Sequence, residues 1–231
     1  MREELMEYFN YSAEEVEARL RSAQQDLVSL WNRYNPKTPD EIAKWYQSRD
    51  VQEAYVFDLA AFWQLEQKKK DLEAFYQVLN ENLRNNQAVL DYGAGNGEVL
   101  LYLAERLPMR FVYADYLGAT REFAMWRALK RGLTNIYFTD LRPLDRQYHA
   151  IFCLDVLEHC DDLLGTAKML CDHLIPGGLF FVQVAFAFDP NFHPMHLTKN
   201  AKYQHTFNSE LMPSFGMEQV NTWLWRKKIN A

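Results

Sequence analysis

Carboxylate and imidazole side chains gather in two short stretches of the C-terminal half of the chain. Glu158 and His159 are adjacent at the end of an apolar run, and His193 and His196 follow in a later segment. Carboxylate oxygens and imidazole nitrogens together bind several divalent metals. A histidine here can instead act as a general base or orient a substrate, or the group can be purely structural. These residues alone leave all three roles open, and the candidate catalytic residues are His159, His193 and His196.

A glycine-rich turn between residues 88 and 100 is the second stretch that could do chemistry. Apolar residues lead into Asp91, and Gly93, Gly95 and Gly97 follow before an apolar helical pattern begins. This pattern predicts a buried strand, a tight turn and a helix. Because glycine has no Cβ, a ligand can approach the backbone of such a turn closely. We therefore expect a cofactor at this turn.

Glu98 separates the two classes of cofactor that use a turn of this kind. Dinucleotide-binding proteins favour G-x-G-x-x-G, in which the later glycines let a pyrophosphate approach the helix. Glu98 stands where the third glycine of that pattern would be, and its carboxylate would repel a pyrophosphate. S-adenosylmethionine carries a carboxylate, an amine and a sulfonium but no phosphate, so it suits this turn better.

Four more strands are expected after the turn, and two of them end in an acid. Asp115 ends the first, about 20 residues beyond the glycines, where a carboxylate accepts hydrogen bonds from ribose hydroxyls. Asp140 ends the second, and a proline followed by two glycines lies in the last. The expected strands are residues 109–115, 135–140, 151–159 and 174–182.

Over residues 85–186 these motifs, in this order, resemble the class I S-adenosylmethionine-dependent methyltransferases. The resemblance implies an α/β, Rossmann-like fold with a mostly parallel twisted sheet and helices on both faces. It also implies S-adenosylmethionine as cofactor, with Asp115 on the ribose, Asp140 at the adenine amino group and the end of the fourth strand facing the methyl. The cofactor-binding residues it implies are Asp91, Gly93, Gly95, Gly97, Asp115, Tyr116, Asp140, Leu141 and Leu154.

A subset of this family implies a metal. The small-RNA 2′-O-methyltransferases and ubiquinone O-methyltransferases have a similar acid-x-x-Glu-His run and a later histidine, which hold a divalent ion. Asp155-x-x-Glu158-His159 is similar to that run, and such a metal could bind the acceptor oxygen and lower its pKa. The candidate metal ligands are Glu158, His159, His193 and His196.

Residues 1–84 are predicted to form a helical segment before a core of residues 85–231. Ser12 and Glu15 make a capping box, Pro36 ends that helix, and further helices are expected from Thr38 and over residues 50–83. The aromatic residues of this segment either pack the helices together or line an acceptor pocket as a lid. Lys68 to Lys70 are expected to face solvent. The candidate lid residues are Trp45, Tyr46, Tyr55 and Trp63.

Composition and charge indicate which partners and which cellular compartment to expect. The 231 residues carry a formal net charge of −6, which argues against a nucleic-acid partner, since phosphate binding needs a basic face. We expect no membrane partner, because no apolar run approaches the roughly 18 residues of a spanning helix. Three cysteines without C-x-x-C spacing and an N-terminus without a signal-peptide core favour a cytoplasmic protein. The N-terminal helices could also join two copies in a homodimer.

The end of the chain is the least regular part. Residues 208–215 are consistent with a helix and residues 217–225 with a strand. Class I methyltransferases usually finish with an antiparallel pair of strands, and only one clear strand is found here.

The expected function is methyl transfer from S-adenosylmethionine to an oxygen or nitrogen of a small metabolite, with a preference for oxygen from the Glu-His and later His pattern. One rival is a catalytically silent methyltransferase-like binding or scaffold protein, and the filled cofactor positions argue against it. The other rival is a nicotinamide-dependent oxidoreductase, which Glu98 disfavours.

Overall fold

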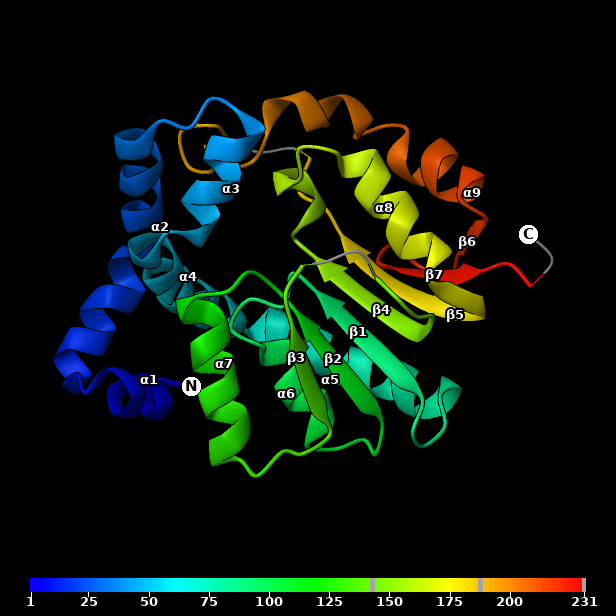
Figure 1. The fold of residues 1–231 in the computed structure, drawn as a ribbon, viewed down its shortest axis with the longest axis horizontal. Coiled ribbons are helices and arrows are strands. Elements are labelled where there is room, and N and C mark those ends of the chain that lie inside the picture. Colours follow the sequence, from blue (N-terminus) through cyan, green and yellow to red (C-terminus); the bar gives the residue numbers. More distant parts are fainter. Residues whose placement is uncertain (142–143, 187–188, 230–231) are drawn as a thin grey trace.

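The sheet of this protein has the strand order β3-β2-β1-β4-β5-β7-β6 (Figure 1). The computed structural model describes residues 1–141, 144–186 and 189–229. The first five strands pair in parallel, whereas β7 runs antiparallel to both β5 and β6. The strands are β1 (Ala88–Tyr92), β2 (Arg110–Ala114), β3 (Ile136–Thr139), β4 (Tyr148–Leu154), β5 (Leu174–Gln183), β6 (Met217–Gln219) and β7 (Leu224–Lys227).

The strand order reverses at β1. From β1 the chain moves outward to β2 and β3, and it then returns to place β4 on the other side of β1. Parallel strands connected in this way leave a crevice beyond their carboxyl ends at the point of reversal. The predicted α/β, Rossmann-like fold is therefore confirmed, and the glycine turn after β1 opens into this crevice.

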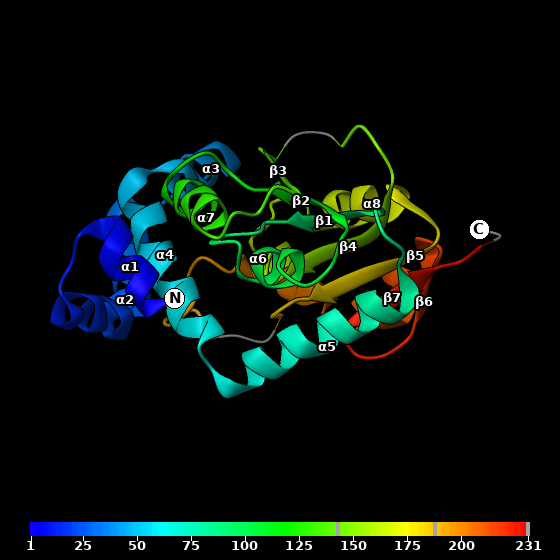
Figure 2. The same ribbon diagram turned by 90° about the horizontal axis from the view of Figure 1, so that it is seen from below.

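Helices cover both faces of the sheet. Helices α5 (Glu66–Asn82) and α6 (Glu98–Ala104) bury their apolar side chains on one face, and α8 (Leu163–Asp172) buries its own on the other. Figure 2 shows α5 and α8 on opposite sides of the strands. Phe152 of β4 and Phe181 of β5 stack at 4.1 Å between ring centroids, and the Phe75 ring of α5 meets both edge-on. Apolar packing on both faces thus holds the strand ends that form the crevice.

The first four helices of the N-terminal segment extend beyond one end of the sheet (Figure 1), whereas α5 lies along one face of it. Both predicted caps are present, because Ser12 with Glu15 and Thr38 with Glu41 form capping boxes. The single helix predicted over residues 50–83 is wrong: it is two helices that separate at Gln64 and Leu65. The break is needed because α4 packs on α2 and α7, whereas α5 packs on the sheet. The helices are α1 (Arg2–Phe9), α2 (Ala13–Tyr34), α3 (Pro39–Gln47), α4 (Arg49–Trp63) and α7 (Ala119–Lys130).

Buried ion pairs of Arg127 connect α1 to the glycine turn. The Arg127 side chain of α7 is 0% exposed, and it donates to Glu4 of α1 at 2.9 Å and to Glu98 of α6 at 2.6 Å. It also donates to the carbonyl of Asn96, inside the turn, at 3.0 Å. Burial alone raises the pKa of Glu4, but Arg127 and Arg131 outweigh it and keep that pKa below its usual value. The first helix is therefore attached electrostatically to the loop that follows β1.

The C-terminal part of the fold differs from the sequence prediction. Residues 217–225, expected as one strand, contain β6 and the start of β7, joined by a turn in which the Asn221 side chain accepts from the backbone N–H groups of Trp223 and Leu224. No glycine or proline marks this turn in the sequence, so residues 217–225 were interpreted as a single strand. The helix predicted over residues 208–215 is a π-helical turn (Phe207–Leu211) followed by the single helical turn α9 (Met212–Ser214). Within the described part of the chain, every helix is too short or too polar to cross a bilayer.

Candidate active site

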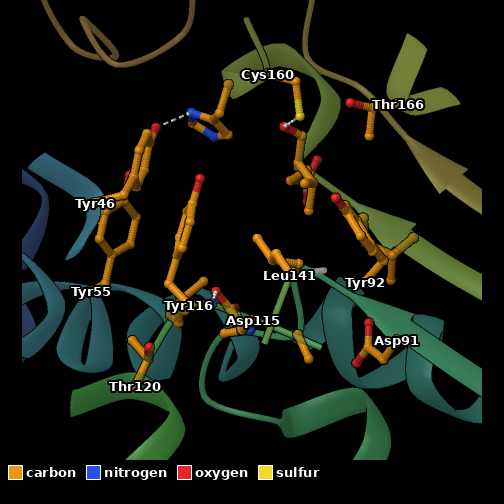
Figure 3. Close-up of a pocket in the computed structure, with 18 of the residues that line it drawn as sticks. Tyr46, Tyr55, Asp91, Tyr92, Asp115, Tyr116, Thr120, Leu141, Cys160 and Thr166 are labelled. Atoms are coloured by element: carbon orange, nitrogen blue, oxygen red, sulfur yellow. Dashed lines mark hydrogen bonds between the residues drawn. The ribbon is translucent and has the colours of Figure 1, made fainter. Parts of the chain in front are cut away.

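A cavity of about 400 Å³ lies beyond the carboxyl ends of β1 and β4, between the sheet and helices α3 and α4. Its volume is in the range of small-molecule sites. Tyr46, Tyr55 and Tyr116 stand along one side, and Tyr92 and Thr166 stand across from them (Figure 3). Residues of both the N-terminal segment and the sheet therefore face the same space.

The glycine turn has the shape that its sequence predicts. Gly95 has a φ of +55°, and a Cβ built on it would lie 2.5 Å from Cδ1 of Leu59 on α4. A side chain at this position would be strained by the positive φ and would displace the Leu59 side chain from the turn. Leu59 and Gly95 both line the cavity, so this contact closes one wall of it.

Asp115, which directly follows β2, stabilises the glycine turn by hydrogen bonds. One carboxylate oxygen accepts from the Gly95 N–H at 2.5 Å, and the other accepts from the Tyr116 N–H at 2.6 Å. Burial raises the pKa of Asp115 to about 6, although these two N–H groups and Arg121 lower it. Asp91, which is 4% exposed, has a pKa raised to about 8 by burial and by the charge of Asp115. The site thus holds two carboxyl groups at the level of the turn.

Most of the cofactor-binding residues that the resemblance implies line the cavity. Gly97 is not among its lining residues: it has a φ of +76° and forms the N-cap of α6. Asp140 also lies outside the lining, although its neighbour Leu141 is part of it. The predicted residues that do line the cavity are Asp91, Gly93, Gly95, Asp115, Tyr116, Leu141 and Leu154.

The Glu-His pair lies on a tight 3-10 turn rather than on the strand that was predicted to run to residue 159. The strand β4 ends at Leu154, and the turn spans Leu157–His159. The buried Asn200 side chain donates to the carbonyls of Glu158 at 3.2 Å and Cys160 at 2.9 Å, which fixes the turn. This geometry brings the His159 ring to the cavity and leaves Glu158 behind it, 1% exposed.

The structure brings together three of the four predicted metal ligands. One potential ligand atom each from Glu158, His159 and His196 all lie within 4.8 Å of one another, whereas His193 is not part of this group. The His193 ring stacks on His196 at 4.9 Å and contacts Gln24 of α2. Of the three candidate catalytic histidines, only His159 lines the cavity.

Burial governs the charge of this cluster. It raises the pKa of Glu158 to about 8, with a further contribution from Asp155, while the N–H of Ala185 donates to one Glu158 oxygen at 3.0 Å. It lowers the pKa of His159 to about 4 and that of His196 to about 3. At neutral pH both imidazoles are therefore uncharged and Glu158 is largely protonated.

Three of the four candidate lid residues line the cavity, namely Tyr46, Tyr55 and Trp63. Trp45 does not, because it points the other way and is buried against Leu27 and Val51. On a short helix adjacent residues face in different directions, so the pattern could not tell Trp45 from Tyr46 until the packing of α3 was known.

Lys68 does not face solvent, although this was expected for all three lysines of the run. Its side chain is 14% exposed, and its ammonium lies 3.0 Å from Oε1 of Gln183 and 3.6 Å from a carboxylate oxygen of Asp155. It therefore joins α5 to the ends of β4 and β5 beside the cavity. Nothing in the sequence marks one lysine of three identical neighbours for this contact.

The charge of Glu98 is not free to repel a phosphate, contrary to what the sequence suggested. Its carboxylate pairs with Arg127 at 2.6 Å, so its negative charge is compensated and does not by itself exclude a pyrophosphate. The case against a dinucleotide then depends on the rest of the site and on family membership.

Comparison with known proteins gives the family. Residues 62–227 match the family model described as a methyltransferase domain. The solved structure of the SeMet-substituted CurJ carbon methyltransferase is similar with a TM-score of 0.57 and 15% identity, covering 88% of this chain and 70% of that one. YcgJ from Bacillus subtilis is similar with a TM-score of 0.52 and 19% identity, covering 67% and 72%. No curated protein matches the chain. The chain therefore belongs to the methyltransferase domain family and has the fold of the class I S-adenosylmethionine-dependent methyltransferases.

Proposed function

We propose that this protein transfers a methyl group from S-adenosylmethionine to an oxygen or nitrogen of a small molecule, with oxygen preferred. One observation carries the proposal: the glycine turn, Asp115 and His159 border a single cavity at the point where the strand order reverses. S-adenosylmethionine, when bound, supplies an electrophilic methyl carbon. The protein must then bind it, orient the acceptor and take up the acceptor's proton.

The cofactor half of the cavity is assigned to β1, β2 and the turn between β1 and α6. Asp115 is assigned to the ribose hydroxyls, which donate to its carboxylate, and Leu141 to the adenine side of the site. Each hydrogen bond to a charged acceptor is worth roughly 1.5–3 kcal/mol. Asp115 already accepts hydrogen bonds from two backbone N–H groups, which hold its oxygens in place. This preorganisation supports the assignment.

The acceptor half is assigned to His159 and to the helices of residues 1–84, which act as the lid of a core of residues 85–231. The lid contributes Tyr46, Tyr55 and Trp63 to the cavity, and an aromatic cavity of about 400 Å³ favours a small molecule over a polymer. The acceptor oxygen forms its bond to the methyl carbon as the sulfur–methyl bond breaks, with the bonding pair staying on sulfur. The hydroxyl proton passes to His159.

Calorimetric titration with S-adenosylmethionine and with NADH, followed by a turnover assay, tests this function. We expect binding of S-adenosylmethionine and not of NADH, and formation of S-adenosylhomocysteine when a metabolite extract is added. Binding of NADH alone would favour the oxidoreductase. Binding of S-adenosylmethionine with no turnover over a wide range of extracts would favour a silent binding protein.

Asp115→Ala is expected to weaken binding of S-adenosylmethionine by roughly 1.5–3 kcal/mol or more, because the variant leaves the ribose hydroxyls and the Gly95 N–H without an acceptor. In the parent protein, affinity should fall as pH drops below about 6, since burial raises the pKa of Asp115 to that value and only the ionised carboxylate accepts both hydroxyls. Calorimetry at several pH values measures both effects. An unchanged dissociation constant in folded Asp115→Ala would contradict the assignment.

We further propose, as a separate candidate, that Glu158, His159 and His196 hold a divalent cation. The donor set fits, because the three side chains converge within 4.8 Å, both imidazoles are neutral, and the second Glu158 oxygen is buried without a hydrogen-bond partner among the described residues. Such an ion would polarise the acceptor oxygen, and because it would occupy the free lone pair of His159, it is an alternative to proton transfer to His159. Its binding would displace the proton of Glu158.

Manganese supplies the test of the metal candidate. We expect one Mn²⁺ to bind to the parent protein, as measured by the loss of the free-ion signal in electron paramagnetic resonance, and its affinity to fall at least 10-fold in Glu158→Gln. His205→Gln, an exposed histidine outside the cluster, is the matched control. Absence of Mn²⁺ uptake at millimolar concentration would rule the metal out and leave His159 as a metal-free base.

A further inference from the structure

His159 is held through one of its two ring nitrogens. Its Nδ1 lies 2.7 Å from the hydroxyl oxygen of Tyr46 and 3.2 Å from the backbone carbonyl oxygen of Met195. Tyr46 belongs to α3 of the N-terminal segment, whereas Met195 lies in the segment that follows β5. Two parts of the chain that are far apart in the sequence thus meet at a single nitrogen.

The chemistry of these two oxygens decides which nitrogen of the neutral ring carries the proton. A carbonyl oxygen can only accept a hydrogen bond, whereas a tyrosine hydroxyl can rotate and either donate or accept. If Nδ1 had no proton, its lone pair would face the lone pairs of the Met195 carbonyl, which has no other donor among the described backbone and side-chain contacts. With the proton on Nδ1, both oxygens can accept a hydrogen bond from it, and no two lone pairs face each other. The other ring nitrogen, Nε2, then carries the lone pair.

Tyr46 is itself fixed by contacts that reach the cofactor side. The Gln52 side chain, 3% exposed, donates to the Tyr46 carbonyl at 2.9 Å, and its oxygen accepts from the Thr120 backbone N–H at 3.2 Å and hydroxyl at 2.9 Å. Thr120 lies at the start of α7, directly after the loop that contains Asp115 and Tyr116. The Gln52 oxygen can come this close only because residue 118 is glycine, with a φ of +147° and no Cβ to collide with that oxygen.

Aromatic neighbours fix the ring of Tyr46. It stacks on Tyr55 at 5.9 Å and on Tyr116 at 6.4 Å, and it meets the His159 ring edge-on at 5.8 Å (Figure 3). Rings packed on several sides restrict the rotation that would carry the hydroxyl away from Nδ1. The hydroxyl position is therefore a product of the lid's packing against the core.

We propose that the Met195 carbonyl sets His159 in the Nδ1–H tautomer and that Tyr46 is a positioning residue, whose hydroxyl accepts from the same Nδ1–H and holds the ring in this orientation. Nε2 is then the nitrogen that takes the hydroxyl proton of the acceptor while the methyl–oxygen bond forms and the sulfur–methyl bond breaks. This role in the reaction rests on the proposed function, whereas the tautomer itself does not. The lid thereby acts on the proton transfer and not only on the shape of the pocket.

Nitrogen-15 NMR of the uniformly labelled protein, without cofactor or acceptor, tests the tautomer directly. Long-range proton–nitrogen spectra distinguish a protonated from an unprotonated ring nitrogen, and the His159 signals are assigned by their loss in His159→Gln. We expect Nδ1–H in the parent protein and in Tyr46→Phe, with the Nδ1 and Nδ1–H signals of His159 displaced in Tyr46→Phe by the loss of one acceptor. Tyr92→Phe, which removes a hydroxyl elsewhere on the cavity, should keep the parent spectrum. An Nε2–H ring in the parent protein, or His159 signals unaltered in Tyr46→Phe, would overturn the proposal.

Initial rates with methyl-labelled S-adenosylmethionine and a fixed amount of metabolite extract test the role in the reaction. Tyr46→Phe should lower the maximal rate roughly 10-fold, the usual scale for loss of an orienting partner, with the KM for S-adenosylmethionine unchanged. A rise in that KM at constant maximal rate would contradict positioning of His159. If the parent protein shows no turnover, the proposed function fails, and the NMR result still decides the tautomer.

Discussion

Replacement of His159 by Gln is expected to lower the maximal rate of methyl transfer by about 100-fold or more. A positioned general base contributes typically 10²–10⁴-fold, and His159 is the only one of the three candidate histidines that lines the described cavity. Gln keeps a polar side chain near the Tyr46 hydroxyl but cannot accept a proton. Binding of S-adenosylmethionine should change little, because the cofactor half of the cavity lies on β1, β2 and the glycine turn.

Rates at saturating S-adenosylmethionine, with labelled cofactor and a metabolite extract, measure this effect. His205→Gln changes an exposed histidine and serves as the control. Because burial lowers the pKa of His159 to about 4, the base stays unprotonated and the maximal rate should hold as pH falls to about 5, then decline. A parent-like rate in His159→Gln would remove the imidazole from the reaction and leave it a structural role.

The second large effect concerns folding. Arg127→Met should lower the free energy of unfolding by about 3–5 kcal/mol, the usual cost of removing one partner of a buried ion network. The variant leaves Glu4 and Glu98 without their shared cation and the Asn96 carbonyl without its donor. Although methionine has a similar length, it restores none of these charges.

Urea unfolding followed by far-ultraviolet circular dichroism measures the loss. Arg49→Met is the matched control, because Arg49 also forms two ion pairs but its side chain is 64% exposed; exposed pairs are worth about 0–1 kcal/mol. Similar losses in the two variants would mean that burial adds nothing to the Arg127 network. In that case the Arg127 pairs would hold α1 to the core no more strongly than exposed ion pairs do.

The parallel strands, and the side of the cavity that we assign to the cofactor, were predictable from the sequence because their signals are local. Each central strand is an apolar run, and Asp91 and Asp115 mark the carboxyl ends of β1 and β2. A residue at the end of a parallel strand must lie on the same edge as its counterparts, whatever the rest of the chain does. The positions of Asp115, Tyr116, Leu141 and Leu154 on the cavity follow from that rule.

The side of the cavity that we assign to the acceptor was predictable only in part, because it depends on contacts between distant segments. Tyr46 meets His159 across more than a hundred residues, and Lys68 meets Gln183 in the same way. No pattern within α3 separates Tyr46 from Trp45, and none within the lysine run singles out Lys68. Likewise His193 and His196 read as an equal pair, yet only His196 packs on His159.

The pairing of Glu4 with Arg127 also has a consequence for the order in which the protein is made. The two residues are separated by 123 positions, so on the ribosome α1 emerges long before its partner in α7 exists. Until then Glu4 remains hydrated, and the entropy of closing so long a loop is recovered only when α7 has formed. The contact of α1 with α7 is therefore a late event in folding, whereas the packing of α1 on α2 joins neighbours in the sequence.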